Sequence, residues 1–377
     1  MKIALVLDDS IDRPDGVQQY VLTLGAFLSR AGHEVHYLCS TSSRSDVTVH
    51  SLARNVGVTF NGNGLRIPLP TSRRAIRSLL DQERYDVIHV QTPHSPLFAA
   101  RVVDEARKLQ ARSVRIVGTF HILPDSKVSE WGTHALGRVL ARNLRRFDAF
   151  MAVSEPAAAF ARRTFGIAAT VVPCPVDVTR FADDAAGRSP VPGSDGRLVL
   201  AFLGRLVERK GVLELVRALD ALPADVQERL EVRIGGKGPL LGDLEAAVEV
   251  SALPHVSLPG FVAEEDKAAF YADADIAVFP ATGGESFGIV LVEAMASQAG
   301  RGAGVVLAGA NPGYLSVIGD DPRVSVDARD SAAFAESLRV LISDPGLRAA
   351  LHAEQAARVQ RFDVERVGAQ VLEVYGA

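Results

Sequence analysis

Short apolar runs alternate with amphipathic stretches along this chain, and that alternation limits its fold more than any other feature. The runs rich in β-forming residues are 2–7, 34–38, 86–90 and 114–120. Apolar residues at helical spacing mark the stretches 17–31, 71–84, 97–110 and 134–146. This pattern is typical of βαβ units, in which helices cover both faces of a parallel sheet.

The alternation stops at a polar stretch, "DDAAGRSPVPGSDGR", and then begins again with "LVLAFLG", "LEVRIGG", "HVSLPG" and "IAVFP". A chain of 377 residues, 47% of them hydrophobic, is long enough for two domains with a core each. We therefore predict an α/β protein with two Rossmann-like doubly wound domains, 1–178 and 179–357, and a helix over 358–377 that crosses back to the first domain. Ligands would bind in a central cleft, at the carboxyl ends of the strands.

Composition excludes several classes of protein. A net charge of −4 gives no reason to expect a nucleic-acid partner. Cys39 and Cys174 are isolated, so neither a zinc site nor a disulfide framework is predicted, which fits a reducing cytoplasm. The apolar run near the start is too short for a signal peptide, and no segment reaches the 18 or so apolar residues of a membrane span. We expect a cytoplasmic protein that meets a membrane, if at all, peripherally on its inner face.

The segment "TGGESFGIVLVEAMA", residues 282–296, allows two interpretations. Thr282 and Glu285 stand at the spacing of a helix capping box. However, two glycines would then lie in the first helical turn, where each costs about 1 kcal/mol relative to alanine. We favour the second interpretation, in which the glycines let a ligand approach and the backbone N–H groups of Phe287, Gly288 and Ile289 face an anion from a helix N-terminus.

Six segments together resemble the landmarks of one enzyme family. They are "DGVQQYV" at 15–21, "GTFH" at 118–121, "GRLVERKG" at 204–211, "GGKGP" at 235–239, "GFVAEEDKAAFY" at 260–271 and the segment at 282–296. In this order they resemble the retaining glycosyltransferases of the GT-B fold, family 4. Within that family they are most similar to the actinobacterial phosphatidylinositol mannosyltransferases. The resemblance implies transfer of a hexose, mannose from GDP-mannose, to an acceptor hydroxyl of a phosphatidylinositol-type lipid, without a metal or other cofactor.

The chemistry of a sugar-nucleotide donor explains the charged motif residues. The leaving diphosphate gains negative charge, which Arg205 and Lys210 would stabilise. By resemblance, Glu293 accepts hydrogen bonds from the ribose hydroxyls, and Glu285 holds hydroxyls of the transferred sugar. A solvated basic loop at Arg205, and an arginine partner for Glu293, remain alternatives.

The remaining donor-side predictions also come from the resemblance. Lys267 and the backbone of Val262 match positions that read guanine, although Lys267 also fits a surface lysine. Gly16 fits a phosphate-binding turn after the first strand, where the family shows two glycines and this chain has Asp15 in the first place. His121 resembles the histidine that hydrogen-bonds the donor sugar.

The acceptor prediction depends on a basic segment and one glutamine. Arg66, Arg73, Arg74 and Arg77 resemble a membrane-facing segment, since a basic amphipathic helix binds anionic lipid. Gln18 matches a residue that holds an inositol phosphate. The alternative, in which these arginines are only solvated charges on a helix surface, stays open, because Asp9 and Ile122 depart from the family pattern.

A second departure follows Glu293, where residues 298–301, "QAGR", are additional to the family pattern. They would either lengthen a helix or loosen the nucleotide pocket. Two other functions fit the same motifs. One is a glycosyltransferase that uses a different nucleoside-diphosphate sugar and a soluble acceptor, and the other is a non-catalytic protein that binds sugar nucleotides.

Overall fold

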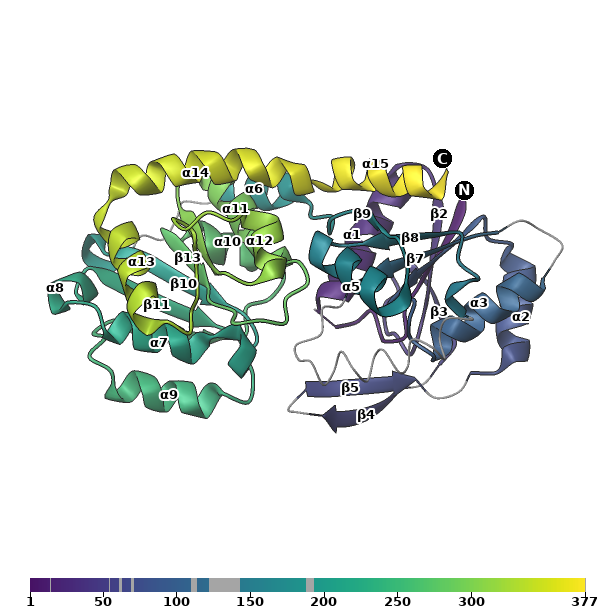
Figure 1. Cartoon of the computed structure of the whole chain (residues 1–377), viewed down its shortest axis with the longest axis horizontal. Helices are drawn as coiled ribbons and strands as arrows, with labels where there is room; N and C mark the ends of the chain where they lie inside the picture. Colours follow the sequence, from purple (N-terminus) through teal and green to yellow (C-terminus); the bar gives the residue numbers. More distant parts are fainter. Residues whose placement is uncertain are drawn as a thin grey trace. The chain divides into compact units, whose positions relative to one another are not determined.

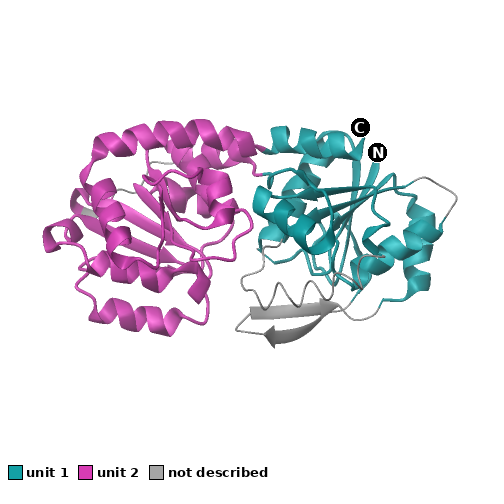
Figure 2. Cartoon of the chain, in the orientation of Figure 1, with its two compact units in different colours: residues 1–175, 364–377 teal, residues 176–363 magenta. Residues whose placement is uncertain are grey.

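The computed structural model describes residues 1–13, 15–53, 55–60, 63–68, 71–109, 114–121, 143–187 and 193–376. The chain divides into two compact units (Figure 2). Unit 1 contains Met1–Pro175 and Val364–Ala377, and unit 2 contains Val176–Asp363. Most of the helix predicted over 134–146 lies outside the described residues.

Unit 1 is built on a parallel sheet (Figure 1). Its strand order is β3-β2-β1-β6-β7-β8-β9. The central strand β1 is apolar on both faces, and its residues from Ile3 to Val6 are fully buried, as expected where helices cover both faces of a sheet. The strands are β1 (Lys2–Val6), β2 (Glu34–Cys39), β3 (Thr48–Ser51), β6 (Val87–Gln91), β7 (Arg115–Phe120), β8 (Ala149–Ala152) and β9 (Thr170–Val171).

The helices of unit 1 are α1 (Gly16–Arg30), α2 (Arg73–Glu83), α3 (Phe98–Lys108), α5 (Glu155–Phe165) and α15 (Val364–Tyr375). The first three follow predicted amphipathic stretches, whereas α5 was not predicted. The helix predicted over 358–377 begins at Val364, since residues 358–362 belong to the end of the preceding helix and to a 3₁₀ turn. A separate antiparallel hairpin, β4 (Asn55–Phe60) and β5 (Asn63–Pro68), lies between β3 and α2 in the sequence. The sequence patterns did not predict this hairpin.

The last helix, α15, packs against α1 in unit 1. Gly368 allows this close contact, because a Cβ atom there would lie 2.3 Å from the ring of Phe27. The helix is also held by polar contacts. The Tyr375 hydroxyl lies 2.7 Å from Nδ1 of His89, and Arg30 forms an ion pair of 2.9 Å with Glu365. The chain therefore ends in the same unit in which it begins.

Unit 2 repeats the architecture with a parallel sheet ordered β12-β11-β10-β13-β14-β15. Its strands are β10 (Leu198–Leu203), β11 (Leu230–Gly235), β12 (Val256–Gly260), β13 (Ile276–Phe279), β14 (Val305–Gly309) and β15 (Ser325–Val326). Its helices are α6 (Val178–Ala186), α7 (Val212–Asp220), α8 (Ala224–Gln227), α9 (Leu241–Val250), α10 (Lys267–Ala272), α11 (Ile289–Arg301), α12 (Pro312–Ile318), α13 (Ser331–Ser343) and α14 (Pro345–Val359). Short 3₁₀ turns are η1 (Ser194–Gly196), η2 (Glu208–Lys210) and η3 (Gln360–Phe362).

Both sheets reverse their strand order at one point. In unit 1 the reversal lies between β1 and β6, and in unit 2 it lies between β10 and β13. Doubly wound folds bind ligands outside the carboxyl ends of the strands at this point, because the loops on either side diverge there. The predicted sites can therefore be located in each unit separately.

Candidate functional site

In unit 2, two loops meet at the reversal point, one after β10 and one after β13. Gly211 brings them together, since its φ is +71° and a Cβ atom there would lie 2.0 Å from the carbonyl oxygen of Pro280. The backbone N–H of Thr282 donates to the carbonyl of Arg209 at 2.9 Å. The motif at 204–211 and the segment at 282–296 thus form one edge of unit 2, at the carboxyl ends of β10 and β13.

Three charged side chains form the centre of this edge. The Glu285 carboxylate accepts a hydrogen bond from Arg209 and forms an ion pair of 2.9 Å with Nζ of Lys210. Burial lowers the pKa of Lys210, and nearby Arg209 and Arg205 act in the same direction, while Glu285 opposes them. Lys210 Nζ also lies 3.4 Å from the hydroxyl of Tyr314. The predicted residues Lys210 and Glu285 are therefore in direct contact.

Arg205 lies on the same loop and is exposed. Its guanidinium has no ion-pair partner among the described residues. Because its charge acts on Lys210, it belongs to the same electrostatic neighbourhood. Because the guanidinium of Arg205 is not paired with any described residue, its N–H groups can donate to a bound anion beside Lys210, which is paired with Glu285.

Helix α11 begins at this edge, with Gly288 as its N-cap residue and no side-chain cap. The capping box between Thr282 and Glu285 is therefore wrong, because both residues precede the helix by several positions. The predicted N-terminal residues Phe287, Gly288 and Ile289 do stand at the helix start. Its first turn has N–H groups that no side chain caps, an arrangement that favours an anion.

Glu293 lies one turn further into α11 and is buried, with 2% of its surface exposed. Its partner is Lys267, whose Nζ lies 3.3 Å and 3.5 Å from the two carboxylate oxygens. Lys267 also forms an ion pair of 2.7 Å with Glu264. Burial raises the pKa of Glu293, and Lys267 offsets only part of that effect. Burial lowers the pKa of Lys267, but the two carboxylates outweigh it and the net pKa is raised.

This pair changes two of the alternatives considered for the sequence. The partner of Glu293 is a lysine and not an arginine, and Lys267 is not a free surface lysine, since its side chain is only 12% exposed. Val262 lies in the loop after β12, and its side chain would be 3.1 Å from a Cβ atom at Gly235. The predicted base and ribose positions are thus a loop residue, the first residue of α10 and a residue of α11, all in unit 2.

Residues 298–301, which the sequence pattern predicts to be additional, form the last turn of α11. The amide of Gln298 is buried and donates to the carbonyl of Ala274 at 3.2 Å, and Arg301 forms an ion pair of 2.9 Å with Asp275. Gly300 packs against α6, where a Cβ atom would lie 2.1 Å from the carbonyl oxygen of Ala182. The insertion is therefore anchored at the helix C-terminus, away from the N-terminus that faces the loops.

In unit 1, His121 directly follows β7 and is 8% exposed. Its Nε2 lies 2.6 Å from Oε1 of Gln91, and its ring meets the Tyr20 ring edge-on at 4.7 Å. Burial lowers the pKa of His121 to about 3, so the imidazole is neutral near pH 7. The histidine is therefore a hydrogen-bonding group and not a cation.

The first strand-to-helix turn places Gly16 at the start of α1. Asp15 is the N-cap residue and forms an ion pair of 3.2 Å with Arg13, which also lies 3.7 Å from Asp9. Gln18 is buried, and its amide donates to the carbonyl of Ser10 at 3.1 Å. Arg13 thus balances the two acids that depart from the family pattern.

Two of the predicted lipid-facing arginines are engaged by acidic residues of α3. Arg73 pairs with Asp104 and Glu105 at 2.8 Å each, and Arg77 pairs with Glu105 at 2.6 Å. Burial of Glu105 raises its pKa, but its cationic partners outweigh that effect and lower it to about 2. Arg74 has no ion-pair partner among the described residues. The side chain of Arg66, in β5, and the whole of Ile122 lie outside the described part.

Sequence reasoning missed several residues of these sites. Arg209 lay inside a quoted motif, so its charge was a usable signal. Tyr20 also lay inside a quoted motif, at 15–21, whereas Tyr314 and Gln91 were not detectable, because they reach the sites from distant positions in the sequence. Cys39 and Cys174 are free, buried thiols.

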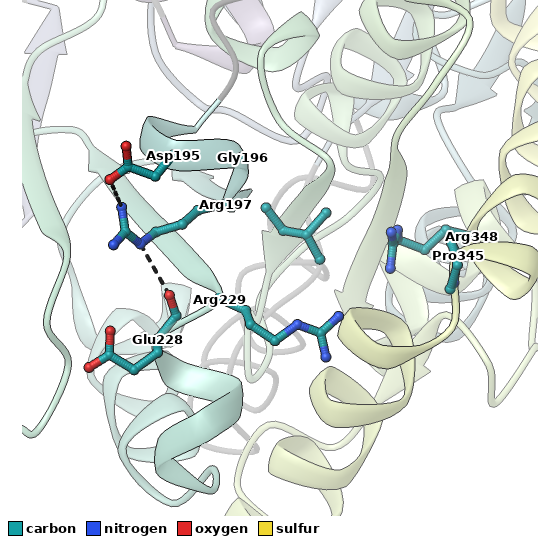
Figure 3. A pocket seen from close by; sticks show the side chains of 8 residues that line it. Asp195, Gly196, Arg197, Glu228, Arg229, Pro345 and Arg348 are labelled. Atoms are coloured by element: carbon teal, nitrogen blue, oxygen red, sulfur yellow. Dashed lines mark hydrogen bonds and ion pairs between the residues drawn. The ribbon is translucent and has the colours of Figure 1, made fainter.

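A cavity of about 360 Å³ lies elsewhere in unit 2, beside the residues that precede β10 and β11 (Figure 3). Arg348 donates to the carbonyls of Leu341 and Ile342 at 2.6 Å and 3.0 Å, and Arg229 donates to Ile342 at 3.4 Å. These contacts neutralise the carboxyl end of α13. The arginines of this cavity thus have a structural role, at the opposite edge from the candidate site.

Comparison with known proteins assigns the family. The profile Glycosyltransferase Family 4 matches residues 14–180, and the profile Glycosyl transferases group 1 matches residues 188–358. The phosphatidyl-myo-inositol mannosyltransferase of Mycolicibacterium smegmatis is 33% identical over 100% of this chain and 93% of its own length. The chain belongs to glycosyltransferase family 4. The corresponding protein of Propionibacterium freudenreichii is 32% identical over 100% of this chain and 94% of that protein.

Solved structures of glycosyltransferases share the fold of this family 4 chain. A glycosyltransferase from Rickettsia africae has a TM-score of 0.77 at 16% identity, covering 99% of this chain and 97% of that chain. Anabaena HepE in complex with UDP has a TM-score of 0.77 at 19% identity, covering 100% of both chains. The predicted GT-B fold and glycosyltransferase activity are confirmed. No helix in the described part of this family 4 chain combines the length and apolar character needed to cross a membrane.

Proposed function

We propose that this glycosyltransferase transfers mannose from GDP-mannose, with retention of configuration, to a hydroxyl of a phosphatidylinositol-type lipid at the inner face of the membrane. The observation that carries the proposal is the cluster of Arg209, Lys210 and Glu285 at the uncapped start of α11. These groups stand together where a doubly wound sheet binds its ligands.

The cluster supports stabilisation of a leaving diphosphate. Glu285 holds Lys210 and Arg209 in place before any ligand arrives, so little reorganisation is needed when charge develops. Arg205 adds an unpaired guanidinium, and the α11 N–H groups add oriented dipoles. These groups supply positive potential from the protein itself, so the proposed reaction needs no metal ion.

The buried pair of Glu293 and Lys267 supports a nucleoside position beside the diphosphate. A carboxylate accepts two hydroxyl hydrogen bonds, which suits a ribose, and an ammonium donates to a purine carbonyl, which suits guanine. The ion pair holds both groups ready at 3.3 Å. We assign ribose to Glu293 and guanine to Lys267 and the Val262 backbone.

In unit 1, His121 supports a role at the transferred sugar. The ring is neutral, and the Gln91 amide fixes its orientation at 2.6 Å. Because its single N–H, on Nε2, is donated to Gln91, the neutral imidazole offers Nδ1 as an acceptor for a sugar hydroxyl and does not attract the diphosphate. We assign the sugar hydroxyls to His121 and Glu285 and the phosphate turn to Gly16.

The acceptor assignment is supported by the names of the relatives, which are phosphatidyl-myo-inositol mannosyltransferases. Gln18 would hold the inositol phosphate, for which its amide must leave the Ser10 carbonyl. Arg74 offers an unpaired charge for an anionic surface, whereas Arg73 and Arg77 are already paired within unit 1. Membrane attraction by α2 is therefore expected to be weak.

The test combines binding and transfer. The melting temperature of the protein is measured with GDP, UDP, ADP and the corresponding nucleotide sugars. A ligand at 100 times its dissociation constant adds about 2.7 kcal/mol to the free energy of unfolding. We expect the largest shift with GDP and GDP-mannose, followed by transfer of radiolabelled mannose to phosphatidylinositol. A larger shift with UDP would contradict the guanine assignment. Donor binding without transfer to lipid or soluble inositol phosphate would favour a non-catalytic binder.

A further inference from the structure

Two histidines on adjacent strands of unit 1 form a cluster that the proposed reaction does not use. His36 lies in β2 and His50 in β3, and the parallel register pairs His36 with Thr48. Since His50 stands two residues beyond Thr48, both imidazoles project from the same face of the sheet. Their ring centroids are 5.0 Å apart.

The same face receives the carboxyl end of α2. Leu38 of β2 packs in one cluster with Leu80 of α2 and with Tyr85, which follows the helix. This packing brings Glu83, the last residue of α2, to the histidines. The donor atoms of His36, His50 and Glu83 all lie within 4.8 Å of one another.

The hydrogen-bond pattern leaves Nδ1 of His36 without a hydrogen, so that this nitrogen keeps its lone pair. Nε2 of His36 lies 3.1 Å from a carboxylate oxygen of Glu34, which accepts hydrogen bonds only, so Nε2 carries the hydrogen. Nδ1 is then unprotonated. A carboxylate behind one imidazole nitrogen is the usual support for a metal ligand at the other.

The separations around that lone pair match a tetrahedral site. Ligand atoms about 2.1 Å from a tetrahedral Zn²⁺ ion stand about 3.4 Å apart. Nδ1 of His36 lies 3.1 Å from Nε2 of His50 and 3.7 Å from Oε2 of Glu83. The Tyr85 hydroxyl oxygen, 3.0 Å from the same nitrogen, offers a fourth position that water could also fill.

We propose that His36 Nδ1, His50 Nε2 and Glu83 Oε2 form a binding site for a divalent transition-metal ion such as Zn²⁺. Two imidazoles and one carboxylate suit Zn²⁺ rather than Mg²⁺ or Ca²⁺, which prefer oxygen ligands. The ion would join the edge strand β3 to β2 and α2. His36 lies three residues before the carboxyl end of β2, about 10 Å along the strand, so the role is structural.

Lys2 competes with the metal ion for the carboxylates. Its Nζ lies 2.5 Å from Glu83 and 2.9 Å from Glu34. A bound divalent ion must share Glu83 with this ammonium or displace it. Removing the charge, as in Lys2→Met, is therefore expected to strengthen metal binding, a result that a merely structural histidine cluster would not produce.

The test is a titration of the untagged, chelator-treated full chain with Zn²⁺ against a chromophoric chelator. Co²⁺ is the spectroscopic probe, because tetrahedral Co²⁺ has intense visible bands. We expect one ion per chain, at least tenfold weaker binding in His50→Gln and in Glu83→Gln, and unchanged binding in His255→Gln. Zn²⁺ should also raise the melting temperature of the wild type.

His50 and Glu83 are chosen because they are only partly buried, so their variants keep the buried His36 and the core. Circular dichroism confirms that each variant is folded. Absence of saturable Zn²⁺ binding in the wild type would overturn the proposal, as would binding that survives both substitutions. Neither result affects the proposed transfer reaction, whose donor binding is measured separately with GDP.

Discussion

The two units share one strand order at their reversal points but place opposite kinds of chemistry there. In unit 2 the edge is charged, with Arg209, Lys210 and Glu285 in direct contact. In unit 1 the loop after β1 carries the ion pairs of Arg13 with Asp9 and Asp15, but the ends of β6 and β7 form a neutral, buried edge, where His121 is bonded to Gln91. The topology therefore decides where a ligand binds, and the side chains decide which part of it.

This difference has a physical basis. A diphosphate needs cations and dipoles fixed in advance, and the ion pairs with Glu285 offset part of the cost of burying Lys210 and Arg209. A sugar or alcohol is neutral, so buried neutral donors and acceptors suit it better, because buried charges are expensive to desolvate. The predictions below test this division between a charged and a neutral edge.

The largest effect is expected at the charged edge. Lys210→Ala and Arg205→Ala should each lower turnover about tenfold to a thousandfold, in the range typical of removing one preorganised charge contact. Initial rates with saturating donor measure this loss. Arg217→Ala, which removes an exposed arginine of α7, is the matched control and should keep wild-type turnover. Equal rates in all three variants would mean that the cluster does not act on the leaving group.

The second prediction separates the two acids of unit 2. Glu293→Ala should weaken GDP binding about tenfold to a hundredfold, since charge-assisted hydrogen bonds contribute about 1.5–3 kcal/mol. Glu285→Ala should mainly slow transfer, because it holds Lys210 and the transferred sugar. Calorimetric titration with GDP distinguishes them. Equal loss of GDP affinity in both variants would contradict the assignment of ribose to Glu293.

The third prediction concerns the neutral edge. The folded pKa of His121 is depressed to about 3, so its contribution to stability is present above the unfolded pKa of about 6.5 and is lost as the pH falls. Stability should decline by about 1.4 kcal/mol per pH unit for this group below that value. Denaturant unfolding at several values between pH 6.5 and pH 4 gives the free energy of unfolding as a function of pH, and its slope should be shallower in His121→Gln than in the wild type.

Tyr20→Phe is the control for that slope. It alters the same contact with the His121 ring but leaves the imidazole in place. The free energy of unfolding of Tyr20→Phe should fall with decreasing pH as steeply as that of the wild type. A slope unchanged in His121→Gln would show that the histidine is not held neutral by burial.

The smallest effect is expected at the membrane surface. Arg74→Gln should reduce binding to anionic vesicles only a few-fold, because one basic residue near such a surface contributes about 1 kcal/mol. Sedimentation at low salt measures it. Arg73→Gln and Arg77→Gln are less suitable, since they remove partners of the buried Glu105 and should also lower the melting temperature. Wild-type protein that ignores anionic vesicles at low salt would make a lipid acceptor untenable.

Local patterns predicted most of the regular structure. Eight apolar runs became β1, β2, β6, β7, β10, β11, β12 and β13. Strands covered on both faces are mostly apolar, and β12, an edge strand with no fully buried residue, departs most from that rule among these eight. The hairpin of β4 and β5 was missed, as were β3, β8, β9, β14 and β15. The last five strands have two to five residues each, too few for a clear periodicity. The capping box, the interpretation not favoured from the sequence, is excluded because Thr282 and Glu285 have the right spacing but lie in the loop before α11.

The sequence by itself determined that the chain is an α/β glycosyltransferase, because apolar periodicity and ordered motifs are local properties that survive without coordinates. Only the tertiary structure decided which charges meet. Glu285 pairs with Arg209 and Lys210 across more than 70 positions, and Glu293 pairs with Lys267 across 26. Such pairs depend on which loops the strand order brings together, and Coulomb attraction acts through space and not along the chain.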